Sequence, residues 1–365
     1  MHTLWTFLGL PLLALVLSIA SCKEDGATGI SSDCTSSTNL ETMLATYGSR
    51  GARITDEFAN SAQSIAASMP DGSTQLTASQ VEQIRERTLQ GQLDYQQALP
   101  YAPGPDLDLL VDGNINPFPV NESAVDALSE RNDPTLPQEP NFDRGLPALD
   151  YILFQDSTAE NTAARLRNNP GELALLRALV DDLQLQARSL SNAWEDAEVS
   201  LPQRVGSGAG SGLSTVVNLV SKHFEDLRRD KLGTPLGVST LNIPNPQTTE
   251  APYSRRSIAL LRAGIESSRR FMRNDGNGPA LQDYLLALAN PEAKELVQDL
   301  LDQYDLVMQA LQAVEESLAK AVVDDRDDAQ ELYNRLSRQV VNLKTDVPAV
   351  ACVAITYVDN PSDSD

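Results

Sequence analysis

The sequence predicts an all-α protein made of two packed helical bundles, of about four helices each, with Pro-rich loops. Two observations support this fold class. Apolar residues recur at three- and four-residue spacing, for example Leu173, Leu176, Val180 and Leu183 in the helix expected over 170–197. Alternating runs of β-branched residues are scarce, which argues against a sheet.

Pro, Gly and Asn residues divide the chain into separate helical segments. Two segments begin with the spacing of a capping box, in which Thr38 precedes Glu41 and Thr77 precedes Gln80. We expect helices over residues 39–69, 77–98, 122–130, 145–156, 170–197, 213–231, 254–273, 278–289, 291–321 and 325–345.

The N-terminus has the pattern of a bacterial lipoprotein signal peptide. Residues 4–20 are almost entirely apolar, carry no charge, and are too few to span a bilayer comfortably. Small side chains precede Cys22, which we expect to become the lipidated first residue of the mature chain. An uncleaved N-terminal anchor helix is the alternative.

Composition suggests where the folded parts begin and end. A tract rich in Gly, Ser, Thr and Asp follows Cys22 and buries too little apolar surface to fold alone, and a second Gly/Ser tract interrupts the helical pattern near the middle. We expect a signal peptide at 1–21, a tether at 22–37, an N-terminal bundle at 38–205, a linker at 206–212, a C-terminal bundle at 213–358 and an acidic tail at 359–365.

The formal net charge is −23, and no basic stripe is present. Such a chain cannot neutralise the phosphates of a nucleic acid or of an anionic membrane surface. We therefore expect no nucleic-acid partner, and contact with a membrane through the lipid anchor only.

Four separate segments, in order along the chain, resemble conserved blocks of the imelysin family. They are GLPALDYILF at 145–154, FEDLRRDKLGTPLG at 224–237, PYSRRS at 252–257 and the stretch 346–359. The resemblance implies a two-domain helical protein of the bacterial envelope that is linked to iron uptake. Some members of the family are classed as metallopeptidases.

The family motif Gly-x-His-x-x-Glu is altered in this chain. Its positions are occupied by Gly145, Pro147 and Asp150, so the histidine and glutamate ligands are missing. Only His223 remains in the mature chain, so a two-histidine zinc site cannot form, and we assign no catalytic residue and no metal ligand. His223 lies on an apolar helix stripe and is expected to be a packed or half-exposed helix residue there. A lone haem ligand is the alternative.

Asp150 shares a helix face with apolar residues and should be at least partly buried. A buried carboxylate requires a partner, and Arg144, Arg255 and Arg256 are the candidates, with the latter two favoured. The pair would act either as a structural clasp between the halves or as part of a ligand site. The motif positions expected to form the ligand site are Gly145, Pro147, Asp150, Ser254, Arg255, Arg256 and Ser257.

These features favour a lipid-anchored, non-enzymatic binding component of iron or haem uptake, with its site between the two bundles. We expect an outer-membrane lipoprotein that faces the periplasm or the cell surface and contacts an outer-membrane uptake partner. Iron or haem is a candidate ligand, and zinc is disfavoured. A metallopeptidase and a structural or partner-docking module are the alternatives.

We predict a disulfide between Cys34 and Cys352, because the compartment is oxidising and the two cysteines flank the helical core. A pair of buried free thiols is the alternative. Closing so long a loop should stabilise the fold by about 4 to 5 kcal/mol in the chain-entropy model. Peptide mapping by mass spectrometry without reductant should recover the crosslinked peptide. Separate peptides, or Cα atoms more than about 7 Å apart, would contradict the bond.

Overall fold

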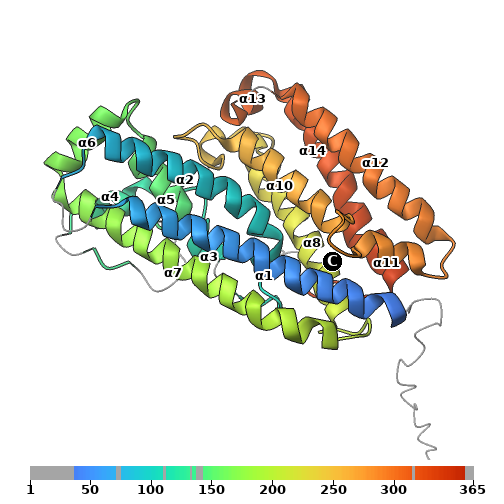
Figure 1. The fold of residues 1–365 in the computed structure, drawn as a ribbon. Helices are drawn as coiled ribbons and strands as arrows, with labels where there is room; N and C mark the ends of the chain where they lie inside the picture. The colour runs from blue at the N-terminus through green and yellow to red at the C-terminus, as the bar shows by residue number, and fades with distance from the viewer. Residues whose placement is uncertain are drawn as a thin grey trace, which may run out of the picture.

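The computed structural model describes residues 37–70, 75–109, 112–131, 134–136, 143–314 and 317–357. Within these ranges every regular element is a helix, which confirms the all-α prediction (Figure 1). Cys22, Cys34, the signal peptide and the acidic tail lie outside the described residues, so lipidation and the disulfide stay predictions. None of the described helices is long and apolar enough to cross a membrane.

The N-terminal half is built on three long helices that lie side by side, α1, α2 and α7 (Figure 1). Shorter helices pack against this group, with α5 and α4 on α7 and α6 on α2. The elements are α1 (Ser37–Ser68), α2 (Ala78–Ala98), η2 (Leu99–Tyr101), α3 (Asp112–Ile115), α4 (Glu122–Ser129), α5 (Gly145–Phe154), α6 (Ala159–Asn168), α7 (Pro170–Ser200) and η3 (Leu201–Gln203).

The C-terminal half pairs α12 with α14 and packs α10 and α8 against them. Its elements are α8 (Gly212–Asp226), η4 (Leu227–Gly233), α9 (Thr234–Leu236), η5 (Pro246–Thr248), α10 (Ser257–Met272), α11 (Leu281–Ala287), α12 (Glu292–Ala313), α13 (Leu318–Asp324), α14 (Arg326–Val341), η6 (Asn342–Asp346) and α15 (Val347–Ala351). The predicted linker lies between the halves, where Arg204 donates hydrogen bonds to the carbonyl of Gly210 and to Thr215.

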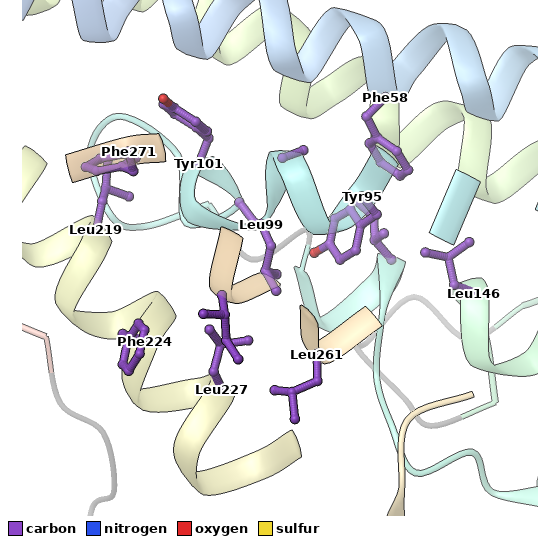
Figure 2. Close-up of a cluster of buried hydrophobic side chains, with 14 of the residues drawn as sticks. Phe58, Tyr95, Leu99, Tyr101, Leu146, Leu219, Phe224, Leu227, Leu261 and Phe271 are labelled. Carbon is purple, nitrogen blue, oxygen red and sulfur yellow. The ribbon is translucent and has the colours of Figure 1, made fainter. Parts of the chain in front are cut away.

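The two halves share a continuous apolar core, because α2 packs against α10 and α8 packs against α1. Aromatic side chains fill this contact (Figure 2). Tyr47 of α1 and Tyr101 pack on Phe271 of α10 with ring centroids 4.6 and 5.2 Å apart, and Phe58 packs on Tyr95 at 4.9 Å within the N-terminal half. Such rings bury large apolar areas and favour these tilted contacts.

Several helix boundaries differ from the sequence prediction. The helix α6 was missed, although Thr158 caps its start by accepting a hydrogen bond from the amide of Asn161. The capping box of Thr77 and Gln80 is confirmed. The box at Thr38 stays a prediction, because the side chain of Thr38 lies outside the part of the chain that the structure describes. The single helix expected over 291–321 is two helices, α12 and α13, and the second is capped by Ser317.

Two expected α-helices continue as π-helical turns, η4 and η6. Each π segment ends two residues before a proline, Pro235 after η4 and Pro348 after η6. Proline cannot donate to the preceding turn, and its ring clashes with the carbonyl four residues earlier. A wider turn accommodates it without ending the helix, as π-bulges do elsewhere.

His223 is a packed residue of α8, as predicted. Its imidazole is 2% exposed, and its Nε2 lies 3.0 Å from the carbonyl oxygen of Gly264 on α10. The Ser267 hydroxyl lies 3.3 Å from the same nitrogen. Burial lowers the pKa of His223 from 6.5 to about 3, so the ring stays neutral at physiological pH.

His223 should therefore make the fold sensitive to acid. Below pH 6.5 the unfolded chain binds a proton that the folded protein excludes until about pH 3, so stability present above this window is lost as pH falls through it. The slope from this residue is on the order of 1.4 kcal/mol per pH unit. Urea unfolding at pH 7, 6 and 5 should show a smaller slope for His223→Gln than for the native protein. Equal slopes would contradict this assignment.

Candidate functional site

The start of α5 is fixed by backbone conformation and by an ion pair. Gly145 has a φ of 66°, and a Cβ atom there would lie 2.2 Å from the carbonyl oxygen of Ile115, so only glycine fits. Pro147 lies in the first turn, where its missing N–H has no helical acceptor. Arg144 precedes the helix and pairs with Asp182 of α7 at 2.6 Å. The motif segment is therefore firmly positioned on α7.

Asp150 lies inside α5 with no exposed surface. Its Oδ1 accepts a hydrogen bond from Nε2 of Gln92 on α2 at 3.2 Å. Its Oδ2 accepts from the backbone amides of Tyr253 and Ser254 at 3.1 and 3.4 Å. Burial raises the pKa of this carboxyl, and the hydrogen bonds oppose that rise. The carboxyl group thus joins α5, α2 and the turn before α10.

The prediction of an arginine partner for Asp150 is wrong. Arg255 is exposed and Arg256 is half-buried, and within the described part of the chain neither is ion-paired. Arg144 is already paired with α7. The reason lies in the backbone, because Ala251 and Arg255 have φ values of 48° and 59°. The chain turns tightly there and presents amide groups, instead of guanidinium groups, to the carboxyl.

A second buried carboxylate, that of Glu250, lies against the next turn of α2. Gln96, one turn after Gln92, donates to Oε1 of Glu250 at 3.1 Å, and Asn116 donates to the same oxygen at 2.8 Å. Lys231 of η4 donates to Oε2 of Glu250 at 2.6 Å and to Gln96 at 2.7 Å. The side chains of Lys231 and Glu250 are each 4% exposed. Both buried charges are therefore paired and hydrogen-bonded, as burial requires.

The sequence analysis missed this cluster, although part of its signal was readable. Thr88, Gln92 and Gln96 recur every four residues on α2 and so form a polar stripe along one face, which is buried. A buried polar stripe predicts polar partners on the facing elements. Glu250 lies in a loop, where no periodic pattern indicates its burial.

A cavity of about 470 Å³ lies beside Asp150, between the C-terminal end of α5 and the turn before α10. Tyr253 and Ser254, whose amides bind Asp150, belong to its wall. The lining residues are Arg85, Phe154, Gln155, Asp156, Ser157, Pro252, Tyr253, Ser254 and Arg255. Of the predicted site residues, Ser254 and Arg255 line this cavity. Asp150 is not in the lining, but its carboxyl accepts hydrogen bonds from the amides of Tyr253 and Ser254.

The remaining predicted site residues lie outside the cavity lining. Gly145 and Pro147 are buried at the opposite end of α5. Arg256 directly precedes α10 and is half-buried. Ser257 donates a hydrogen bond to the carbonyl oxygen of Glu250 at 2.5 Å and so closes the turn.

The residues at the motif positions do not fit a metal ion. Pro147 has no donor atom, and both oxygens of Asp150 accept hydrogen bonds from N–H groups. In the ranges that the structure describes, no three His, Cys, Asp or Glu side chains lie close enough together to hold a metal. Asp150 therefore has the environment of a hydrogen-bonded structural carboxyl.

These features define a two-bundle, all-α protein with carboxylates buried at the junction of its halves and a cavity beside them. The chain belongs to the imelysin family, whose sequence profile matches residues 44–343. The family resemblance is confirmed, and the blocks at 145–154, 224–237 and 252–257 lie within the matched residues, whereas the stretch 346–359 lies beyond them.

Two solved structures share this fold. A protein described as an iron-regulated protein A precursor from Parabacteroides distasonis matches with a TM-score of 0.64 and 14% identity, over 85% of this chain and 94% of that chain. An imelysin-like protein from Psychrobacter arcticum matches with a TM-score of 0.63 and 17% identity, over 87% and 94%. At these identities the likeness concerns the fold alone. No curated protein matches the chain.

Replacing Asp150 with alanine should leave buried N–H groups of Gln92, Tyr253 and Ser254 without an acceptor. We expect Asp150→Ala to lower the free energy of unfolding by about 3 kcal/mol in urea denaturation at pH 7. Asp150→Asn keeps one carbonyl oxygen for the turn amides and should lose clearly less. An alanine variant as stable as the native protein would contradict this structural role of Asp150.

Proposed function

We propose that this protein is a non-enzymatic binding component of iron acquisition in the bacterial envelope, and that it binds an anionic iron complex in the cavity at Arg255. Membership in the imelysin family supports the envelope role. The Parabacteroides protein with the same fold is described as iron-regulated, which supports the link to iron. The observation that carries the proposal is the chemistry of the cavity wall.

An arginine without an acceptor lines this cavity. Arg255 is exposed and forms no hydrogen bond or ion pair with any described residue. The hydroxyl of Ser254 lies beside the Asp150 carboxyl, and its hydrogen bond opposes the rise in the pKa of that group. A guanidinium group binds carboxylates through two parallel hydrogen bonds, so a ligand that carries carboxylates fits this wall. Ferric citrate and haem, through its propionates, both present such groups.

Hydrogen bonds to its backbone fix the turn that carries Arg255. Asp150 accepts hydrogen bonds from the amides of Tyr253 and Ser254, and Ser257 bonds the carbonyl of Glu250. The backbone of Arg255 is therefore fixed in its left-handed conformation while its side chain stays exposed. A preordered backbone lowers the entropy that ligand binding costs.

The iron complex would bring its own ligands to the metal, and the protein would supply the positive charge and the hydroxyl group. This division suits a site where Pro147 and Asp150 replace the ligands of the family motif. Lipidation at Cys22 would hold the protein on the outer membrane, facing the periplasm or the surface, near an uptake partner. This part of the proposal rests on the N-terminal sequence pattern.

Titration of the purified protein with ferric citrate and, separately, with haem tests the proposal. We expect saturable binding of at least one of them, measured by calorimetry or by the haem absorbance band. Arg255→Ala should weaken that binding about tenfold or more, because a hydrogen bond to a charged group contributes about 1.5–3 kcal/mol.

Arg273→Ala is the matched control. Arg273 is also an exposed arginine, but it follows the C-terminal end of α10, away from the turn that carries Arg255. The Arg273→Ala variant should bind ferric citrate or haem as tightly as the native protein does. Absence of binding to both iron complexes, or equal losses in the two variants, would overturn the proposal.

A further inference from the structure

A second, smaller cavity of about 140 Å³ lies between α1, the end of α2 with η2, and the C-terminal part of α10. It is distinct from the cavity at Arg255. Arg270 lines it, and fifteen residues of mostly helical chain separate Arg270 from Arg255, which is roughly 20 Å at the helical rise. Its lining includes Arg50, Arg53, Gln97, Tyr101, Arg270 and Asp275.

Tyr101 brings an unpartnered hydroxyl to this cavity. The residue is 1% exposed, and its hydroxyl has no hydrogen-bond partner among the described residues. Its ring lies edge-on against Trp194 at 5.0 Å and tilted against Phe271 at 5.2 Å. Figure 2 shows the hydroxyl on the side of the ring that faces α1. Burial raises the pKa of Tyr101 strongly, so the phenol keeps its proton and can donate.

Arg50 of α1 brings a second unpartnered donor. It is 5% exposed, and one end of its guanidinium is held by the carbonyl oxygen of Arg270 at 3.2 Å and by Asp275 at 2.9 Å. Its Nε is buried and has no acceptor within the described part of the chain. Buried donors without acceptors are uncommon and costly, which indicates a partner that the chain does not itself provide.

The chemistry of the unpartnered groups indicates the class of partner. The lining carries Arg50, Arg53 and Arg270 against Glu57 and Asp275, and Arg270 also lies 3.8 Å from Glu266 outside the lining. Both unpartnered groups, Arg50 Nε and the Tyr101 hydroxyl, can donate a hydrogen bond to an anion. Charge-assisted hydrogen bonds from such groups are the strong ones.

We propose that this cavity binds a small oxyanion, with Tyr101 and Arg50 as its buried donors. The volume is that of a few water molecules at about 30 Å³ each, which matches an ion of the size of phosphate, sulfate or acetate. Because Arg50 belongs to the N-terminal half and Asp275 to the C-terminal half, the bound ion would strengthen the contact between them.

Calorimetric titration of the full chain with sodium phosphate, sulfate and acetate, against sodium chloride at equal ionic strength, tests the site. Phosphate and sulfate report on a tetrahedral ion and acetate on a planar one. We expect saturable binding of at least one oxyanion and an oxyanion-dependent rise of the melting temperature. Tyr101→Phe keeps the packed ring, removes only the hydroxyl, and should weaken binding about tenfold.

Tyr304→Phe is the matched control, because it also removes one buried hydroxyl, here one that bonds Ser268 on α10 at 2.7 Å away from the cavity lining. It should keep the oxyanion response even where its own stability falls. No oxyanion-specific binding, or equal binding in the two variants, would overturn the proposal and indicate a cavity filled by water only.

Discussion

Two carboxylates buried against one face of α2 hold the two halves of this protein in register. Asp150 and Glu250 are hydrogen-bonded by Gln92 and Gln96, which lie one helical turn apart. A buried carboxylate is tolerated only when its oxygens are satisfied, and here the other donors come from Lys231 and from the turn before α10. The relative position of the halves therefore depends on directional hydrogen bonds as well as on apolar packing.

The hydrogen bonds of Asp150 also explain the role of the altered family motif. Pro147 and Asp150 cannot hold a metal, and Asp150 instead orders the turn that presents Ser254 and Arg255 to the larger cavity. The motif segment therefore has a structural role at the junction, although it lacks the histidine and glutamate of the family motif. The proposed binding of an anionic iron complex rests on this turn, because the turn places the positive charge of Arg255 and the hydroxyl of Ser254 on the cavity wall.

Arginine groups are concentrated at both ends of α10 in an otherwise acidic protein. Arg255 lies before its first turn, and Arg270 lies in its last turn beside Arg50 of α1. Both places lie where segments from the two halves meet, and both contain donors without acceptors. Local positive potential within a negative molecule favours small anionic ligands over extended polyanions.

The sequence by itself determined the helical class, the family and the position of His223 on an apolar helix stripe, because periodicity, the family's sequence blocks and apolar neighbours are local properties. It also predicted the burial of Asp150 from its helix face. It did not predict the amide partners of Asp150, the pairing of Glu250 with Lys231, or the donors Arg50 and Tyr101 at one cavity. These depend on which distant segments meet and on the backbone conformation at Ala251 and Arg255, which only tertiary packing decides.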